Sequence, residues 1–330
     1  MTELTIVLIS KNQAWNISRL IESVLERTTC VSSREVILVD SASTDETVEL
    51  ASRYPVRILQ LRPDQHLGPA AGRHVGFKHT TGDFVLFLDG DNELYPGWLE
   101  KGLQVLQNDP DVAVVTGPRM PLPMSAKEGD KPPLVNIPIN DAFESRHSGG
   151  TAMFRRSVLN KVGAFNPYLY SDEEPDLSLR IRRAGHRIIK LGHPIAYDYT
   201  DPADTLSTKI ARWKRNLYLG AGQNLRYHLG DDIFWPYLRE RGFGLTPILG
   251  LIIGLVALFW FLATGQFTWF GLWMMLLLLI IIVTAYRKQS LYQAIVTLVE
   301  RLLIADGTIR GFLIKPLDPD KYPGKYDLVK

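Results

Sequence analysis

Short runs of β-branched and other apolar residues alternate with amphipathic stretches over the first 116 residues of the chain. The apolar runs predict strands at residues 5–10, 35–40, 56–61, 84–88 and 112–116. Between the first two runs, an apolar residue recurs at helical spacing, at Ile17, Leu20, Ile21, Val24 and Leu25. Strands that alternate with amphipathic helices are typical of βαβ units, so the pattern predicts an α/β fold with a mostly parallel sheet.

A second block of the same kind follows a proline-rich interruption. Residues 118–138 hold six prolines and few apolar residues, and predict a mobile loop where a lid over a site could lie. Beyond this loop we expect a strand at 151–154, a helix at 175–183 and a strand at 187–191. Within the first block, Ser43 and Glu46 form a capping-box pattern that predicts a helix starting at Thr44.

The C-terminal third contains a long segment without charge. No Asp, Glu, Lys or Arg occurs among the 45 residues between Arg241 and Arg287. About 20 residues at 1.5 Å each cross a 30 Å hydrocarbon layer, so the segment is long enough for two spans. We expect a helical hairpin with spans at 245–263 and 267–286. Two buried helices of a soluble core would need far more surrounding protein than this chain supplies.

Basic residues set the expected orientation of this hairpin. The turn at 264–266 has no charge, whereas the outer ends are flanked by Arg239, Arg241, Arg287 and Lys288. Positive residues stay on the cytoplasmic side, so we expect a multi-pass protein of the cell membrane with both termini and the polar domain in the cytoplasm. The first apolar run is too short for a signal peptide, which agrees with this orientation.

Amphipathic segments lie on both sides of the hairpin. Residues 206–227 predict a basic helix that either contacts an anionic lipid surface or packs on the domain as a solvated helix. Ser290 and Gln293 predict the start of another amphipathic helix, which Gly307 would end and which we expect at the membrane interface. These patterns divide the chain into a domain at 1–200, a membrane-proximal region at 201–243, the hairpin at 244–286, and a cytoplasmic interfacial helix and tail at 287–330.

Charge and cysteine content exclude several classes of protein. The 37 basic and 35 acidic residues nearly cancel, so no strong field points to a nucleic-acid partner. The single cysteine, Cys30, forms no intrachain disulfide, and no Cys/His cluster has zinc-ligand spacing. A lone cysteine near a helix end is typical of a small, inert apolar residue rather than of a nucleophile.

Carboxylates stand at the ends of two predicted strands. Asp40 and Asp89 both fall at the carboxyl edge, where open α/β sheets bind ligands. Asp89-Gly90-Asp91 spaces two carboxylates by one small residue, an arrangement that can hold a divalent ion together with a diphosphate. Turn chemistry produces the same tripeptide often, so the motif needs support from its surroundings.

That support comes from several ordered motifs. Asp40 to Asp45, the glycine-rich segment 68–76 and Thr81-Gly82-Asp83 precede the strand that ends in Asp89-Gly90-Asp91. Further motifs follow at 149–155, 162–165 and 173–180. With these motifs the sequence resembles the family 2 glycosyltransferases over residues 4–200. The resemblance implies an inverting enzyme whose Rossmann-like catalytic domain has the GT-A fold.

The resemblance assigns roles at the donor end of the site. It implies that Asp40 recognises the nucleotide base, that Asp89 contacts the ribose or a metal, and that Asp91 binds Mn²⁺ or Mg²⁺ on the donor diphosphate. Asp45 belongs to the same donor-binding motif. Arg73, where the family has Ala-Arg-Asn and this chain has His74 in place of Asn, would bind phosphate or pair with a nearby carboxylate.

The resemblance also assigns an acceptor side and a base. Gly149 and Gly150 would border the acceptor pocket, where the absence of side chains admits a sugar. The family's Glu-Asp pair aligns with Glu173-Glu174, which makes Glu174 the candidate general base. Ser171 with Glu174 also fits a capping box, which would give Glu174 a structural role instead.

Three further candidates lie later in the chain. The family's metal-contacting His is missing, so Asp198 or His193 would be the additional ligand. Residues 209–213 resemble the Gln-x-x-Arg-Trp motif of processive polysaccharide synthases, with Lys209 in place of Gln. By that resemblance, Arg212 would hold the donor diphosphate and Trp213 would stack on the acceptor sugar.

Together these features predict a metal-dependent, membrane-bound glycosyltransferase that moves a sugar from a nucleotide-sugar donor to a lipid-linked or saccharide acceptor in glycan biosynthesis. Two spans are too few for a translocation channel, so we expect addition of a single sugar. An alternative is a synthase that attaches the sugar directly to polyprenyl phosphate. A second alternative is a membrane protein that binds nucleotide sugar without turnover. Membrane lipids are expected partners, and an oligomer is compatible with the sequence.

Overall fold

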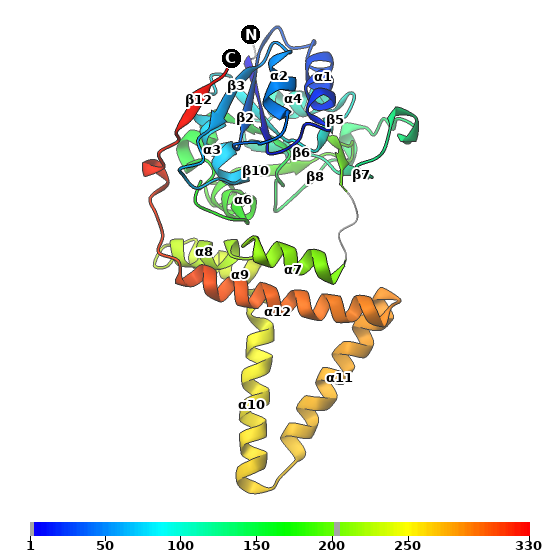
Figure 1. The fold of residues 1–330 in the computed structure, drawn as a ribbon, viewed down its shortest axis with the longest axis vertical. Helices are drawn as coiled ribbons and strands as arrows, with labels where there is room; N and C mark the ends of the chain where they lie inside the picture. Colours follow the sequence, from blue (N-terminus) through cyan, green and yellow to red (C-terminus); the bar gives the residue numbers. More distant parts are fainter. Residues whose placement is uncertain (1–2, 201–204) are drawn as a thin grey trace. The chain divides into compact units, whose positions relative to one another are not determined.

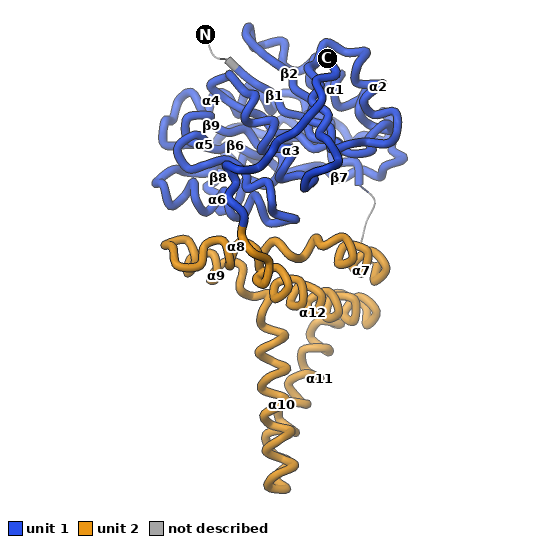
Figure 2. The backbone as a smooth tube through the Cα atoms, turned by 60° about the vertical axis from the view of Figure 1, so that its left-hand side comes forward, with its two compact units in different colours: residues 1–202, 317–330 blue, residues 203–316 orange. Residues whose placement is uncertain are grey.

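The computed structural model describes residues 3–200 and 205–330. The chain forms two compact units, one made of Met1–Pro202 with Leu317–Lys330 and the other of Ala203–Pro316 (Figure 2). The first unit is therefore discontinuous in sequence, because its last residues follow the second unit. This differs from the division expected from the sequence, which left residues 317–330 with the interfacial helix.

The first unit is built on a mixed sheet (Figure 1). In the order of the sheet, the strands among the described residues are β12 (Tyr326–Leu328), β3 (Arg57–Leu61), β2 (Ser33–Asp40), β1 (Glu3–Ser10), β4 (Phe84–Asp89), β9 (Ala152–Arg155), β6 (Val112–Thr116), β10 (Arg187–Lys190) and β8 (Phe143–Glu144). Strands β3, β2, β1 and β4 are neighbours and parallel, as the alternating pattern predicts, whereas β9 lies antiparallel between β4 and β6. Strand β10 is parallel to β6, and β8 and β12 are antiparallel edge strands.

Helices cover both faces of this sheet. Side chains of β1 alternate between the faces, so Ile6 and Leu8 join one apolar core while Val7 and Ile9 join the other. The first core also takes residues of α1 (Ile17–Arg27), α2 (Thr47–Ser52) and α4 (Trp98–Asn108). The second takes residues of α3 (Pro69–Lys78), α5 (Arg156–Val162) and α6 (Glu173–Arg183). A strand buried on both faces explains the continuous apolar runs in the sequence.

A small second sheet corrects the predicted mobile loop at 118–138. This segment contains β7 (Arg119–Leu122), which is parallel to β11 (Ala196–Tyr199), and β11 in turn is antiparallel to β5 (Asn92–Leu94). A 3-10 turn, η1 (Glu128–Asp130), follows, and another, η2 (Ile139–Asp141), comes just before β8. Prolines are compatible with this short edge strand because an edge strand leaves some backbone N–H positions unpaired.

The capping box predicted at Ser43 is wrong. Helix α2 begins at Thr47, and its N-cap residue makes no side-chain hydrogen bond to the helix. Ser43 instead donates its backbone N–H to Asp40 Oδ2 at 2.8 Å. The buried Asp40 carboxylate, three residues earlier, accepts hydrogen bonds from both the backbone N–H and the side-chain hydroxyl of Ser43.

The second unit is entirely helical in its described part. Its elements are α7 (Leu206–Lys214), α8 (Gly220–Tyr227), α9 (Phe234–Arg241), η3 (Gly242–Leu245), α10 (Thr246–Thr264), α11 (Thr268–Lys288) and α12 (Leu291–Leu313). The single helix expected at 206–227 is broken between α7 and α8, where Asn216 has a positive φ of 63°. Helix α12 runs across the base of the α10–α11 hairpin and packs beside α7 and α8 (Figures 1 and 2).

Helices α10 and α11 confirm the predicted hairpin. Gly265 ends α10 in the left-handed conformation, with φ of 73°, which suits a residue without Cβ. Only Gly254 and Ala257 of α10 are buried, and no residue of α11 is. Both helices are long and apolar enough to cross a membrane.

Helix α12 begins as predicted, because the Ser290 side chain accepts a hydrogen bond from the Gln293 N–H at 3.3 Å. It does not end at Gly307 but continues to Leu313. A Cβ at Gly307 or Gly311 would collide with the backbone at Tyr218 or Leu219. These glycines therefore mark close helix–helix packing rather than a helix end.

The last residues of the chain return to the first unit. Strand β12 pairs with β3, and Arg62 forms an ion pair with Asp327 at 2.6 Å. Tyr322 lies in the second core and donates its hydroxyl to the His66 carbonyl. A further 3-10 turn, η4 (Pro319–Lys321), comes before it. We call residues 317–330 the C-terminal strap.

Candidate active site

A buried arginine forms the centre of the site. Arg73, on α3, has 2% of its side chain exposed. Its Nη2 lies 2.6 Å from Asp89 Oδ1 at the end of β4, and its Nη1 lies 2.8 Å from Glu173 Oε1. Burial by itself lowers the pKa of Arg73, but Asp89, Glu174 and Glu173 outweigh it and raise the pKa above its usual value. Arg73 is therefore a permanent cation that pairs with carboxylates, one of the two alternatives left open by the sequence.

The two glutamates of α6 differ in their surroundings. Glu173 is 7% exposed and bound to Arg73, and burial together with Glu174 raises its pKa. The Glu174 side chain is 23% exposed, and its Oε1 lies 3.8 Å from Arg73 Nη2. The sequence singled out Glu174 but gave no role to Glu173, whose position in an acidic turn hid its burial. Glu174 is thus the more accessible carboxylate of the pair.

The start of helix α6 does not fit the alternative of a capping box at Ser171 and Glu174. Helix α6 begins at Glu173, and the preceding residue, Asp172, has a positive φ of 59°. That helix start makes no side-chain cap hydrogen bond. Glu174 is directed instead toward Arg73, which removes the structural role that competed with a chemical one.

Gly150 closes one side of this charged cluster. A Cβ at this position would lie 2.9 Å from Glu174 Oε1, 3.0 Å from Asp89 Oδ2 and closer still to Arg73 Nη2. No side chain fits there without displacing the cluster. Gly149 is different: it is exposed, has a φ of 71°, and nothing lies within 4 Å of its would-be Cβ.

Asp91 and Asp198 bring further negative charge to the same edge of the sheet. Burial, followed by the charges of Asp89 and Asp198, raises the pKa of Asp91 to about 7. Burial also raises the pKa of Asp198, although Arg119 lies 3.4 Å away and opposes the shift. In the described part of the chain, no three His, Cys, Asp or Glu side chains already stand in metal-binding geometry. The donor set nevertheless fits a hard divalent cation, because three carboxylates that disfavour one another's charge are stabilised by a positive ion.

Asn92 connects these parts, and the sequence analysis missed it. Its Oδ1 accepts hydrogen bonds from the Asp89 N–H at 3.2 Å and from the Thr151 hydroxyl at 2.6 Å. Its Nδ2 donates to Asp91 Oδ1 at 3.1 Å. Asn92 therefore fixes the Asp-Gly-Asp turn and ties it to the Gly149–Gly150 segment. Its place directly after the motif was the only available signal.

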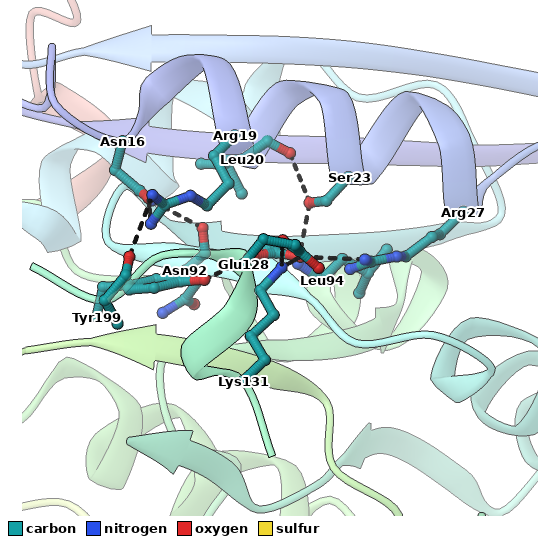
Figure 3. Close-up of polar contacts among 12 residues, drawn as sticks. Asn16, Arg19, Leu20, Ser23, Arg27, Asn92, Leu94, Glu128, Lys131 and Tyr199 are labelled. Carbon is teal, nitrogen blue, oxygen red and sulfur yellow. Dashed lines mark hydrogen bonds and ion pairs between the residues drawn. The ribbon is translucent and has the colours of Figure 1, made fainter. Parts of the chain in front are cut away.

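A buried polar network surrounds Glu93, two residues after the turn, and Arg27, Lys131 and Tyr199 of this network are labelled in Figure 3. Glu93 is 2% exposed and is paired with Arg27 at 3.0 Å and Lys131 at 2.8 Å. Tyr199 donates its hydroxyl to the same carboxylate at 2.8 Å. Lys131 belongs to the segment expected to be mobile, so this network explains why that segment is held against the domain.

The Asn16 side chain anchors α1 to the same region. Its Nδ2 donates to the carbonyls of Gly90 and Asn92, each at 3.0 Å (Figure 3). Both sides of the Asp-Gly-Asp turn are thus held by side-chain amides. The turn is preorganised rather than dependent on a ligand for its shape.

Asp40 and Asp45 shape the loops after β1 and β2. Asp40 is fully buried and accepts hydrogen bonds from Ser43 and from Gln60 Nε2 at 3.3 Å. Asp45 is exposed and accepts the Ala14 N–H at 3.0 Å and the Thr47 N–H at 3.1 Å. A base contact to Asp40 would require one of its present donors to move, and the longest of these contacts are those from Ser10 and Gln60, each at 3.3 Å.

The two histidines considered from the sequence are structural in this arrangement. His193 Nδ1 accepts the Ile137 N–H at 3.2 Å, and its Nε2 lies 2.9 Å from the Pro96 carbonyl. Both ring nitrogens are engaged, so His193 has none left for a metal. His74 Nδ1 lies 2.9 Å from the Phe165 carbonyl, and burial lowers its pKa.

Arg212 and Trp213 lie on α7, in the second unit. Arg212 is exposed. The Trp213 indole N–H donates to Asp306 Oδ2 at 2.6 Å, and Arg310 lies over its ring at 5.4 Å. Lys209 forms an ion pair with Glu300 at 2.9 Å. Within its own unit, Trp213 therefore fastens α7 to α12.

Comparisons with known proteins agree with this architecture. Residues 5–163 match the family described as Glycosyl transferase family 2. The glycosyltransferase AglE of Haloferax volcanii is 26% identical over 54% of this chain and 60% of its own length. An uncharacterized glycosyltransferase of Haemophilus influenzae is 27% identical over 59% of this chain and 67% of its own. The chain thus matches about two thirds or less of the length of these curated relatives.

A solved structure extends the likeness to the fold. The mannosyltransferase PcManGT of Pyrobaculum calidifontis, determined with GDP-Man and Mn²⁺, superimposes with a TM-score of 0.61 at 20% identity. The superposition covers 93% of this chain and 87% of that one. An α/β unit with a carboxylate-rich edge, a match over residues 5–163 and this likeness all lead to one assignment. Residues 5–163 form a domain of the family 2 glycosyltransferases, and the unit that contains them has the GT-A fold.

Proposed function

We propose that this protein transfers a sugar from a nucleotide-sugar donor to a lipid-linked or saccharide acceptor, with inversion at the anomeric carbon. The observation that carries the proposal is the cluster of Arg73, Asp89 and Glu174 packed against Gly150. Curated glycosyltransferase relatives support the reaction class. A relative solved with GDP-Man and another with UDP-GlcNAc support a nucleotide-sugar donor.

Glu174 is the proposed general base. An acceptor hydroxyl must lose its proton as its oxygen attacks the anomeric carbon, and the bond from that carbon to the diphosphate oxygen breaks in the same displacement. Glu174 is accessible, whereas Glu173 is buried against Arg73. Gly149 has nothing within 4 Å of its would-be Cβ and is proposed to leave room for the acceptor, while Gly150 lets the backbone approach this carboxylate closely. A positioned carboxylate of this kind contributes about 10² to 10⁴ in rate.

Arg73 is proposed as a positioning residue. With 2% of its side chain exposed, it holds Asp89 and Glu173 and lies within 3.8 Å of Glu174. Asp40 and Asp45 are proposed to shape the donor pocket through the loops that they tie together. Arg212 and Trp213 remain proposed contacts to the donor diphosphate and the acceptor.

Asp91, Asp89 and Asp198 are the proposed ligands of a divalent cation, Mn²⁺ or Mg²⁺. The raised pKa of Asp91 shows how unfavourable its charge is without a positive partner. Such an ion, when bound, neutralises charge on the diphosphate leaving group. The Mn²⁺ in the mannosyltransferase structure supports this assignment.

The membrane is the proposed site of action. Helices α10 and α11 have the length and the apolar composition expected of two membrane spans, and their side chains are largely exposed. A protein anchored in this way meets lipid-linked acceptors by diffusion in two dimensions. We propose that the catalytic unit and both termini face the cytoplasm, where basic residues flank the hairpin.

A donor screen tests the proposal. The full chain, purified in detergent, is incubated with a panel of nucleotide sugars, a divalent cation and membrane lipid extract, and release of nucleoside diphosphate is measured. Glu174→Gln should bind donor normally and turn over at least about a hundredfold more slowly. Glu26→Gln, the same change at an exposed site on α1, is the control and should match the parent.

Two results would redirect the proposal. Donor binding without release of nucleoside diphosphate from any donor would indicate a binding protein without turnover. Near-normal turnover by Glu174→Gln would leave Asp172, Glu173 and Asp176 as candidate bases and would favour an acceptor that is already an anion. In that case the product would be a sugar phosphodiester on polyprenyl phosphate, which its acid lability distinguishes from a glycosidic linkage.

A further inference from the structure

A pocket lies at the base of the hairpin, wholly within the second unit. Its volume is about 250 Å³, and it opens where η3 and the start of α10 meet α12. One wall is apolar and the other carries a guanidinium group. The lining residues are Phe243, Gly244, Thr246, Pro247, Arg301 and Ile304.

The cation in this pocket has no partner among the residues that the structure describes. Arg301 is exposed and makes no hydrogen bond or ion pair with any residue of 3–200 or 205–330. Its acidic neighbour, Glu300, is used elsewhere: it lies 2.9 Å from Lys209 Nζ and accepts the Tyr218 hydroxyl at 3.2 Å. The positive charge of Arg301 is therefore available to an external anion.

The surroundings specify what kind of anion fits. Residues 205–316 contain twelve Lys and Arg but only five Asp and Glu, whereas the whole chain is nearly balanced. Phe243, at the mouth of the pocket, is 58% exposed, and the Arg241 guanidinium lies over its ring at 5.6 Å. Thr246 and Pro247 of the pocket begin α10, whose apolar side chains from Leu249 onward are largely exposed. An anion bound here thus meets positive charge on one side and hydrocarbon on the other.

We propose that this pocket binds the phosphate group of an anionic bilayer phospholipid. Arg301 would donate charge-assisted hydrogen bonds to the phosphate oxygens, while Phe243 and Ile304 contact the glycerol backbone and the first acyl carbons. A volume of about 250 Å³ suits a headgroup, and the acyl chains would continue along α10 in the bilayer. Free phosphate gains nothing from the apolar wall, so the site favours a phosphate attached to lipid.

Lipid titration followed by native mass spectrometry tests this site. The full chain in detergent at about 150 mM salt receives phosphatidylglycerol, with no donor sugar present. Arg301→Gln should weaken retention of one phospholipid by about 30-fold, within the range for charge-assisted hydrogen bonds. Arg215→Gln removes an exposed charge at the C-cap of α7, outside the pocket. It should change retention less than about threefold, because a charge that does not contact the phosphate acts only at long range and salt screens it.

A second variant separates the pocket from the overall charge. Ile304→Trp fills the cavity without changing any charge and should also abolish specific retention. Equal losses for Arg301→Gln and Arg215→Gln, or full retention by Ile304→Trp, would overturn the proposal in favour of a diffuse basic surface.

Competing ligands identify the source of the phosphate. Inorganic phosphate at millimolar concentration should leave phosphatidylglycerol bound, and displacement by it would overturn the lipid assignment. Polyprenyl phosphate that binds tenfold more tightly than phosphatidylglycerol would also overturn it and mark the pocket as an acceptor site. None of these readouts involves sugar transfer. A negative result for the lipid site would therefore leave the proposed reaction unaffected, and the reverse also holds.

Discussion

Adding one methyl group at Gly150 should damage the reaction far more than the fold. The Cβ of Gly150→Ala would lie 2.9 Å from Glu174 Oε1 and 3.0 Å from Asp89 Oδ2, and closer still to Arg73 Nη2. Ordinary contacts at a Cβ are 3.4–4 Å, so the two carboxylates must retreat by several tenths of an ångström. Arg73 must move further, although it is buried and its Nη1 and Nη2 atoms are already paired with Glu173 and Asp89.

These displacements set the expected magnitudes. Misplacing catalytic groups by about 1 Å costs about 10² in rate, so kcat should fall about a hundredfold. Overpacking of a buried site costs about 1–3 kcal/mol, and each kcal/mol lowers the melting temperature by about 2–4 °C in a unit of this size. The variant should therefore remain folded at assay temperature while losing most of its activity.

The assay compares kcat and the melting temperature for Gly150→Ala, the parent and Gly129→Ala. Gly129 is the matched control, because nothing lies within 4 Å of its would-be Cβ and its φ is not positive. Gly129→Ala should leave both quantities nearly unchanged. If Gly150→Ala kept kcat within threefold of the parent, the cluster around Arg73 would not be the reaction centre.

Three further predictions concern other parts of the molecule. Asp91→Asn should abolish cation-dependent turnover. Because the folded protein holds the pKa of Asp91 at about 7, above its ordinary value of 3.8, its ionisation destabilises the metal-free fold increasingly between those pH values. The variant should thus raise the melting temperature of metal-free protein more at pH 8 than at pH 5, and an equal rise at both would contradict this. Gly311→Ala should disrupt the packing of α8 on α12 and lower the melting temperature, whereas Gly250→Ala, with nothing within 4 Å, should not. In a cysteine-free background, cysteines at Gln266 and at the exposed Lys321 should react with impermeant reagents from opposite sides of the membrane, and same-side labelling would exclude the hairpin topology.

Periodicity predicted the elements whose burial is uniform along their length. Strands β1, β2 and β4 are buried on both faces, and α10 and α11 are apolar all round, so each left a clear signal. Local capping patterns failed where another acceptor or donor competed. Ser43 bonds to Asp40 rather than to its helix, and Glu174 is directed toward Arg73. Such competition depends on residues far away in the chain, which a local pattern does not contain.

The charged residues of the site were easier to predict from the sequence than the hydrogen bonds and ion pairs that hold them in place. The motif pointed to Asp89 and Asp91 because both follow a strand, but it gave no role to Asn92 and Glu93, which form part of the short strand β5. Their importance comes from Thr151 and Lys131, which lie 59 and 38 residues away. Strand β12 was missed for the same reason, since it pairs with β3 across more than 260 residues.

The C-terminal strap has a consequence for the order in which the protein is made. Strand β3 is covered on its outer edge by β12, which the ribosome synthesises only after α10 and α11. Until then β3 is an open edge, and open edges pair with other chains and promote aggregation. A catalytic fragment that stopped at residue 200 would keep this edge exposed permanently. A soluble version of the enzyme should therefore join residue 200 to residue 317 through a flexible linker, so that the last strand can still close the sheet.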